Sequence, residues 1–213
     1  MNMNIAAGHI SRRLVLGACL ALGLAAPVLA QGTDDAVLKG LLPDSYIGAD
    51  SAPVSLIVYS SPTCSHCVDF HANELPKLQE KFVSTGKLKI AYRPFMRNSL
   101  DAVIFMLAHS RGADKFDETV STYMDKFDEL AAAQDTEQAV RSIAEGMGID
   151  KAGFDKAVAD QPYFDQLNAA TKQAQEEFKV AGTPTFFLDG KPLEIASSFE
   201  EVGTAVEAAL PKP

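Results

Sequence analysis

The sequence predicts an α/β fold in which one small sheet is divided by a long helical insertion. An apolar run at 54–59, a helical pattern from 64 and an alternating segment at 88–95 give the order strand, helix, strand. About 80 residues of helical periodicity follow, and strand character returns only at 185–195, before a last helix. The helical stretch could instead be a separate domain. An insertion is preferred, because neither group of strands is large enough for a stable sheet alone, and we expect both groups to share one sheet.

Residues 1–30 are expected to be a cleaved export signal. They contain no Asp or Glu, carry Arg12 and Arg13, and run apolar over 14–26. The segment ends in small and β-branched residues at 28–30, as signal peptidase sites do. The apolar stretch is short for a transmembrane anchor. The arginine pair leaves both the Sec and the twin-arginine export route open.

The expected mature chain begins at Gln31 and keeps only Cys64 and Cys67 of the three cysteines, because Cys19 lies in the signal. Loss of the signal removes two arginines and no acid, so the formal net charge moves from −9 to −11. Nucleic-acid binding relies on Lys and Arg, and the acidic balance therefore argues against a nucleic-acid partner. The acids are scattered along helical segments, which indicates a solvated surface.

The first three elements are justified by their apolar patterns. The run at 54–59 is nearly continuous, as in a strand buried on both faces. From Cys64 to about Phe82 the apolar positions recur at helical spacing, and we expect a bend at Pro76 because proline lacks the N–H. The alternation at 88–95 predicts a second strand.

The remaining elements follow from helical spacing and turn residues. Residues 98–178 read as several helices, with a break marked by Gly148 and Asp150. The apolar segments at 185–188 and 192–195 flank Asp189-Gly190, which predicts a β-hairpin. A closing helix is expected from Ser198, a capping residue, to Leu210.

The sequence Cys64-Ser65-His66-Cys67 opens the first helix directly after a strand, which is typical of a redox-active pair. The unpaired amides and the macrodipole at a helix N-terminus stabilise a thiolate, so Cys64 is the expected nucleophile. Cys67 lies one turn deeper, as a resolving thiol. The imidazole of His66 is placed to add stabilisation to the Cys64 thiolate.

Two other interpretations of the pair stay open. A structural disulfide would close a loop of four residues, which restricts the unfolded chain little. A metal site would take Cys64, Cys67 and His71 as ligands, but it lacks an obvious fourth ligand.

A second motif, Gly182-Thr183-Pro184-Thr185, directly precedes the apolar strand at 185–188. Taken alone, it is a loop whose proline falls where a missing N–H costs least. Its combination with the cysteine pair, with Phe70 and with Glu74-Leu75-Pro76 resembles the DsbA-like periplasmic thiol-disulfide oxidoreductases of the thioredoxin superfamily.

The resemblance implies a thioredoxin fold with an inserted all-helical domain. The thioredoxin-like domain would comprise 46–97 and 179–210, and the insertion would comprise 98–178. It also implies periplasmic localisation, protein substrates with thiols or disulfides, and a membrane partner that resets the pair. No cofactor and no metal are implied.

The same resemblance assigns roles to the site residues. Cys64 is the nucleophile and Cys67 the resolving thiol of a redox-active disulfide. The Thr183–Pro184 bond is expected to be cis, which leaves the backbone before the proline free to pair with an extended substrate. Thr183, Pro184 and Ser65 would shape the substrate site.

Four positions depart from the family pattern. Ser65 stands where the best-known oxidases carry proline, and Val58 where many relatives have a buried acid. His71 replaces an acid found near the site in some members, and it is either a solvated residue or a group that tunes the thiolate. Thr183 is typical of isomerase-like members, whereas the strongest oxidases tend to have valine.

We therefore expect an exported oxidase that introduces disulfides into exported proteins. An isomerase or reductase of the same family is the alternative, although residues 31–47 are short for the dimerising segment that such isomerases use. A peptide-binding chaperone without redox turnover is the alternative from a different class.

Overall fold

One five-stranded sheet organises the molecule. The computed structural model describes residues 36–195 and 197–212, so the predicted signal and Cys19 lie outside the described residues. The strand order is β1 (Tyr46–Ile47), β3 (Leu88–Pro94), β2 (Val54–Ser60), β4 (Thr185–Leu188) and β5 (Lys191–Leu193). β2 and β3 are parallel, whereas the other neighbours are antiparallel. Strands from both ends of the chain therefore share one sheet, as predicted.

The central strand β2 is buried along its whole length, which explains its unbroken apolar sequence. Successive side chains of β2 point to opposite faces of the sheet and pack into different cores. Leu56 and Val58 pack on the face that carries the first helix and the last one, while Ile57 and Tyr59 pack on the opposite face.

The first helix runs without interruption from Ser65 to Val83 as α2 (Ser65–Asp69), η1 (Phe70–Glu74), α3 (Leu75–Leu78) and η2 (Gln79–Val83). Pro76 falls in the first turn of α3, directly after the π-helical turn η1. There the N–H of Leu75 donates to the carbonyl of Phe70, five residues back. A widened turn thus accommodates the proline that lacks a donor.

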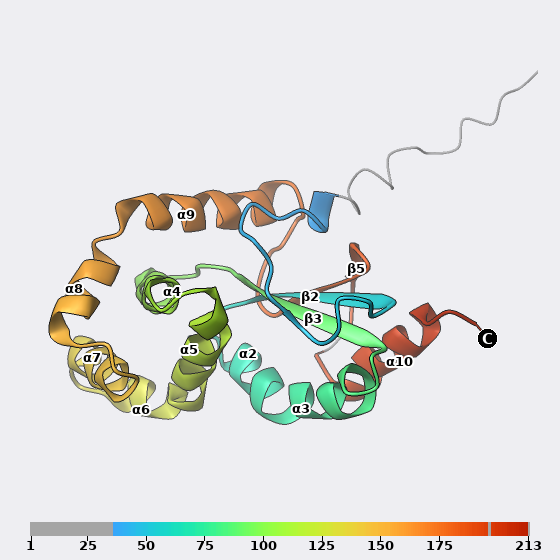
Figure 1. Ribbon diagram of the computed structural model, residues 1–213, viewed down its shortest axis with the longest axis horizontal. Helices are drawn as coiled ribbons and strands as arrows, with labels where there is room; N and C mark the ends of the chain where they lie inside the picture. Colours follow the sequence, from blue (N-terminus) through green and yellow to red (C-terminus); the bar gives the residue numbers. More distant parts are fainter. Residues whose placement is uncertain (1–35, 196, 213) are drawn as a thin grey trace, which may run out of the picture.

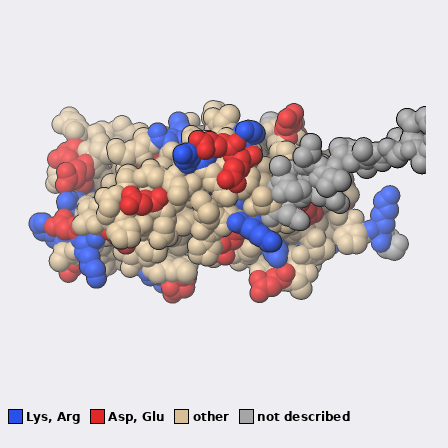
Figure 2. Space-filling view, turned by 90° about the horizontal axis from the view of Figure 1, so that it is seen from above, with Lys and Arg blue, Asp and Glu red and all other residues tan. Residues whose placement is uncertain are grey.

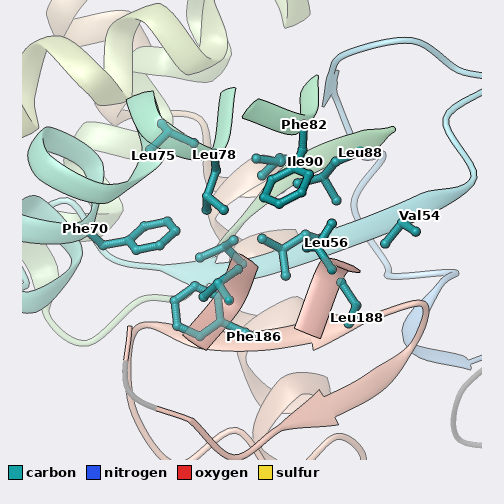
Figure 3. Close-up of a cluster of buried hydrophobic side chains, with 13 residues drawn as sticks. Val54, Leu56, Phe70, Leu75, Leu78, Phe82, Leu88, Ile90, Phe186 and Leu188 are labelled. Atoms are coloured by element: carbon teal, nitrogen blue, oxygen red, sulfur yellow. The ribbon is translucent and has the colours of Figure 1, made fainter. Parts of the chain in front are cut away.

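Figure 3 shows the core between this helix and the sheet. Phe70, Leu78 and Phe82 from the helix meet Leu56 and Phe186 from the strands. The closing helix α10 (Phe199–Ala209) completes the layer, and the Ser198 hydroxyl caps its N-terminus, as expected. This core packs η1, α3 and η2, which continue α2, against the sheet.

Six helices lie between β3 and β4 in the sequence and form the part of the molecule beside the sheet (Figure 1). They are α4 (Ser99–Ser110), α5 (Ala113–Asp125), α6 (Phe127–Ala132), α7 (Thr136–Gly146), α8 (Lys151–Val158) and α9 (Gln161–Glu176). They have a core of their own, which includes Leu107, Tyr123 and Phe154. The expected break falls between α7 and α8, where the Asp150 side chain caps α8. The exact limits of the insertion stay a prediction.

Helix α9 returns the chain to the sheet and covers its second face (Figure 1). Ala174 and the following Phe178 pack with Ile57, Tyr59 and Phe187. The hairpin of β4 and β5 then turns through Asp189 and Gly190, which both have positive φ, as a type I′ turn requires.

The surface carries acidic and basic side chains interspersed with one another on the face that Figure 2 shows. Within 36–195 and 197–212, no helix combines the length and the apolar character needed to cross a bilayer. The exposed large apolar side chains in this part of the chain are Leu38 and Leu41.

Candidate active site

The cysteine pair lies where the central strand passes into the first helix. Cys64 is the N-cap residue of α2, with an extended backbone, and its carbonyl accepts from the N–H of Val68 at 2.9 Å. The amides of the first helical turn have no partner within the helix and face the Cys64 side chain. The predicted placement of Cys64 at a helix N-terminus is therefore confirmed.

The loop before β4 crosses directly over Cys64. The Cys64 thiol donates to the carbonyl of Thr183 at 3.2 Å, although 119 residues separate them. The Thr183–Pro184 peptide bond is cis, as the family resemblance implied. The Oγ1 of Thr183 is buried and has no hydrogen-bond partner among the described residues. The two motifs of the sequence thus meet at the sulfur of Cys64.

The surroundings of Cys64 favour its thiolate. Burial alone would raise the pKa of this thiol, because Cys64 is only 5% exposed. The contact with Thr183, both the backbone and the thiol of Cys67, and the backbone of His66 together outweigh burial and lower the pKa of Cys64 below its usual value. Cys64 is therefore the more readily ionised of the two thiols.

Cys67 has the opposite character. It is 1% exposed, and burial raises its pKa to about 11. The backbone of Ser61 and the side chains of Ser60 and Thr183 favour the thiolate but do not overcome burial. At neutral pH, reduced Cys67 therefore carries its proton.

Ser65 and His66 lie between the two cysteines and are both exposed. The contribution of His66 to the Cys64 thiolate comes from its backbone, whereas the prediction assigned that role to its imidazole. Ser65 occupies the first helical position, beside Cys64 on the solvent side. Both roles that the sequence suggested for these side chains stay predictions.

His71 is neither a solvated residue nor a partner of the thiols. Its Nε2 lies 3.7 Å from Asp125 on α5, and burial lowers its pKa although Asp125 opposes that change. Across 36–195 and 197–212, no three His, Cys, Asp or Glu side chains lie together as metal ligands. The described residues thus give no support to a metal site made of His71 and the two cysteines.

Asp101 is a site residue that the sequence did not reveal. It is fully buried at the start of α4, and its carboxylate accepts hydrogen bonds from the hydroxyl of Ser61, the N–H and hydroxyl of Thr63, and the N–H of Arg97. These bonds fasten the loop directly before Cys64 to the helical insertion. The one available signal was an acid among the apolar residues at 100–107.

A wide groove lies between α4 and α9, next to this loop. It has a volume of about 860 Å³, and Met96, Met106 and Phe164 are among its lining residues. Arg97 and Asn98 stand at its end and donate hydrogen bonds to the carbonyl and hydroxyl of Thr63, respectively. The face of the insertion beside Cys64 is therefore hollowed.

Comparison with known proteins places this geometry in a family. The model of the family described as Thioredoxin matches residues 42–208. A Rickettsia bellii protein whose name is that of a protein-disulfide oxidoreductase is 24% identical over 168 residues, which is 78% of this chain. The chain spans 64% of the length of that relative. Disulfide bond formation protein D of Bacillus subtilis is 22% identical over 77% of this chain and 76% of its own length.

Solved structures show the same fold. Alpha-DsbA1 of Wolbachia pipientis superposes with a TM-score of 0.73 at 22% identity, over 83% of this chain and 95% of its own. A protein-disulfide isomerase of Novosphingobium aromaticivorans gives a TM-score of 0.70 at 21% identity, over 79% and 98% of the two chains. The predicted fold class, a thioredoxin fold with an inserted helical domain, is confirmed.

Proposed function

This chain belongs to the thioredoxin family, and we propose that it is an exported thiol-disulfide oxidoreductase that introduces disulfides into exported proteins. One observation carries the proposal. Cys64 lies at a helix N-terminus with its sulfur 3.2 Å from the carbonyl of Thr183, in surroundings that lower its pKa. Cys67, three residues on, retains its proton.

The oxidative cycle starts from the Cys64–Cys67 disulfide. A substrate thiolate attacks the Cys64 sulfur, the bond between the two cysteines breaks, and Cys67 leaves with the electron pair and takes up a proton. A second substrate thiolate then attacks the substrate sulfur of the mixed disulfide, and Cys64 leaves as a thiolate. Two electrons pass from substrate to protein, and the lowered pKa of Cys64 favours this direction because it makes Cys64 the better leaving group.

The substrate would lie between the loop that carries Thr183 and Pro184 and the groove beside α4 and α9. An extended chain can pair with backbone groups of that loop, while apolar side chains enter the groove lined by Met96 and Met106. Ser65 is exposed at the same edge. We place substrate binding at these elements.

The remaining parts of the proposal rest on the sequence. The composition of residues 1–30 supports export to the periplasm, and continued turnover requires a partner, which we place in the membrane, to reoxidise the pair. The limits 46–97, 98–178 and 179–210 are proposed for the two domains. Thr183 favours a second candidate, an isomerase or reductase of the same fold, in which the electrons flow back to substrate disulfides.

The test is oxidation of a reduced two-cysteine peptide by the full-length protein and by two variants. We expect both Cys64→Ser and Cys67→Ser to abolish oxidation, because neither variant can hold the Cys64–Cys67 disulfide that accepts the two electrons. Offered the oxidised peptide instead, the Cys64 thiolate of Cys67→Ser should attack its disulfide and stay trapped as a mixed disulfide, while the second peptide sulfur leaves as a thiolate. Persistence of both peptide oxidation and insulin reduction in Cys64→Ser would contradict the redox role of this pair. A wild-type protein that binds the peptide but shows neither activity would favour a peptide-binding chaperone.

The equilibrium potential of the pair against glutathione decides the direction. A potential of about −120 mV would support the oxidase. A potential of about −270 mV, as reducing as that of thioredoxin, would contradict the oxidase.

A further inference from the structure

A cavity borders the apolar cluster that contains Cys67, because Phe105, Val120 and Met124 belong to that cluster and line the cavity. It has a volume of about 280 Å³ and is bounded by η1, α3, β3 and α5. Most of its lining is apolar, but polar side chains also reach it: Gln79, Arg93 and Ser121, and the four used below, Ser60, His71, Tyr92 and Asp117. The cycle proposed above uses none of these four.

Strand alternation places two of the four on the same face of the sheet as Cys67. Val58 packs against the first helix, which carries Cys67, and Ser60 lies two residues further along the same strand. Tyr92 is the register partner of Val58 on β3 and packs against the same core. Both hydroxyls therefore belong to the layer between the sheet and the cysteine helix.

These two hydroxyls are buried without hydrogen-bond partners among the described residues. Buried polar groups in proteins are nearly always paired, and ordered water is the usual partner where side chains supply none. The cavity has the space, and Ser60, Tyr92, His71 and Asp117 supply the two to four polar contacts that a buried water needs.

The two hydroxyls also interact electrostatically with Cys67, and Tyr92 does so with Asp117. The side chain of Ser60 lies close enough to Cys67 to favour its thiolate, and the charges of both Cys67 and Asp117 act on the Tyr92 hydroxyl. Asp117 is partly buried on α5, and burial raises its pKa, while the side chain of Ser45 opposes that change. Such a carboxyl keeps its proton to a higher pH than an exposed one, which suits a group that gives and takes a proton.

Cys67 needs such a connection, since it gains or loses a proton in every cycle and is only 1% exposed. Val58, which packs in the apolar core between the sheet and the cysteine helix, has no carboxylate that could exchange this proton. We propose that Asp117 exchanges the proton of Cys67 through the hydroxyls of Tyr92 and Ser60 and through water in this cavity. The proposal rests on the redox function proposed above.

The step balances in both directions. When the disulfide is reduced, Cys67 leaves with the electron pair and receives a proton by way of Ser60 and Tyr92 from Asp117, which is reprotonated by solvent. When Cys67 attacks the mixed disulfide at Cys64, its proton travels the opposite way, and the substrate leaves with the electron pair of the broken bond.

Other charged groups border the cavity. His71 approaches from η1 and is held by Asp125 of α5. Arg93 approaches from β3, but its guanidinium is engaged by Asp44 at 2.6 Å and 2.7 Å. Asp117 is thus the one acid among the lining residues of the cavity.

The test follows ring closure by Cys67 in a single turnover. Full-length reduced protein is mixed with one equivalent of Ellman's reagent, and thionitrobenzoate is recorded by stopped flow. The first equivalent reports attack by Cys64, and the second reports attack by Cys67 after loss of its proton. Asp117→Asn and Tyr92→Phe keep the shape of each side chain, and Asp114→Asn, an exposed acid on the same helix, is the matched control.

At about pH 6 we expect the second phase to be about tenfold slower in both cavity variants than in the wild-type protein. At about pH 9 the second phase should be slowed less than about twofold, because hydroxide takes the proton directly. The first phase and the control are expected to stay within about twofold of the wild-type rate. An unchanged second phase, or a slowing equal at both pH values, would overturn the relay. A failure of the redox function would appear instead as the loss of the first phase in the wild-type protein.

Discussion

The two cysteines share one apolar cluster and nearly the same burial, yet their protons are held very differently. Cys64 is 5% exposed and Cys67 1% exposed. The pKa of Cys64 is lowered because several donors at the helix N-terminus and the Thr183 loop outweigh burial, whereas burial prevails at Cys67. The balance between burial and hydrogen-bond donors therefore decides which thiol is the nucleophile.

The largest expected effect is on the alkylation rate of each thiol when the other cysteine is absent, which tests the difference in pKa. We expect Cys64 in the Cys67→Ala variant to react with iodoacetamide at about pH 7 roughly a hundredfold faster than Cys67 in the Cys64→Ala variant. The thiolate fraction and the access of the reagent both favour Cys64. In urea the two rates should converge, and equal rates in the folded variants would contradict the assignment of Cys64 as nucleophile.

A second test disturbs the loop before Cys64 and leaves the helix that carries Cys67 unchanged. Asp101→Asn replaces a buried acceptor of four donor groups by an amide whose own N–H groups have no acceptor there. We expect a loss of about 2 kcal/mol in the free energy of unfolding, measured with urea. Asp128→Asn, an exposed acid on α6, is the control and should lose less than about 0.5 kcal/mol.

That substitution should also slow alkylation of Cys64 in the Cys67→Ala background, because a loose loop no longer holds the thiolate near its donors. Unchanged stability together with unchanged alkylation would show that the Asp101 hydrogen bonds do not fix the loop.

The smallest expected effect is a difference between single-cysteine variants in how the free energy of unfolding depends on pH. A raised pKa stabilises the fold below the pKa of the unfolded thiol, about 8.5, and this stability is lost as pH rises towards the folded value. Cys64→Ser, which keeps Cys67, should lose about 1 kcal/mol between about pH 7.5 and 9.5 relative to Cys67→Ser. The lowered pKa of Cys64 gives the opposite sign, so Cys67→Ser gains stability over that range. Parallel curves for the two variants would contradict the difference between the thiols.

Local patterns predicted most of the fold. The strands at 54–60 and 88–94, the hairpin at 185–193 and the closing helix all follow from apolar spacing, turn residues and a capping serine. The place of Cys64 at a helix start follows from the same patterns. The cis bond at Pro184 came from the family resemblance, because nothing local in Gly182-Thr183-Pro184 specifies it.

Other features arise only from tertiary structure. β1 has two residues, too few for a period, and Arg93 pairs with Asp44 through a contact between segments 49 residues apart. Asp101 reads as an ordinary first-turn acid of a helix until the loop at 61–63 is seen to fold onto it. The cavity near Cys67 likewise forms where separate elements meet.

Helix α9 is built into two cores at once. Tyr163 and Leu167 near its start pack in the cluster that holds both cysteines, while Ala174 near its end packs beneath the sheet. The hydroxyl of Thr171 also accepts the N–H of Met96, at the point where the chain leaves the sheet. A swing of the helical part away from the sheet would have to open one of these cores. Helix α9 thus ties the helical part to the sheet, and the protein substrates proposed above would be accommodated by side-chain rearrangement along the groove rather than by such a swing.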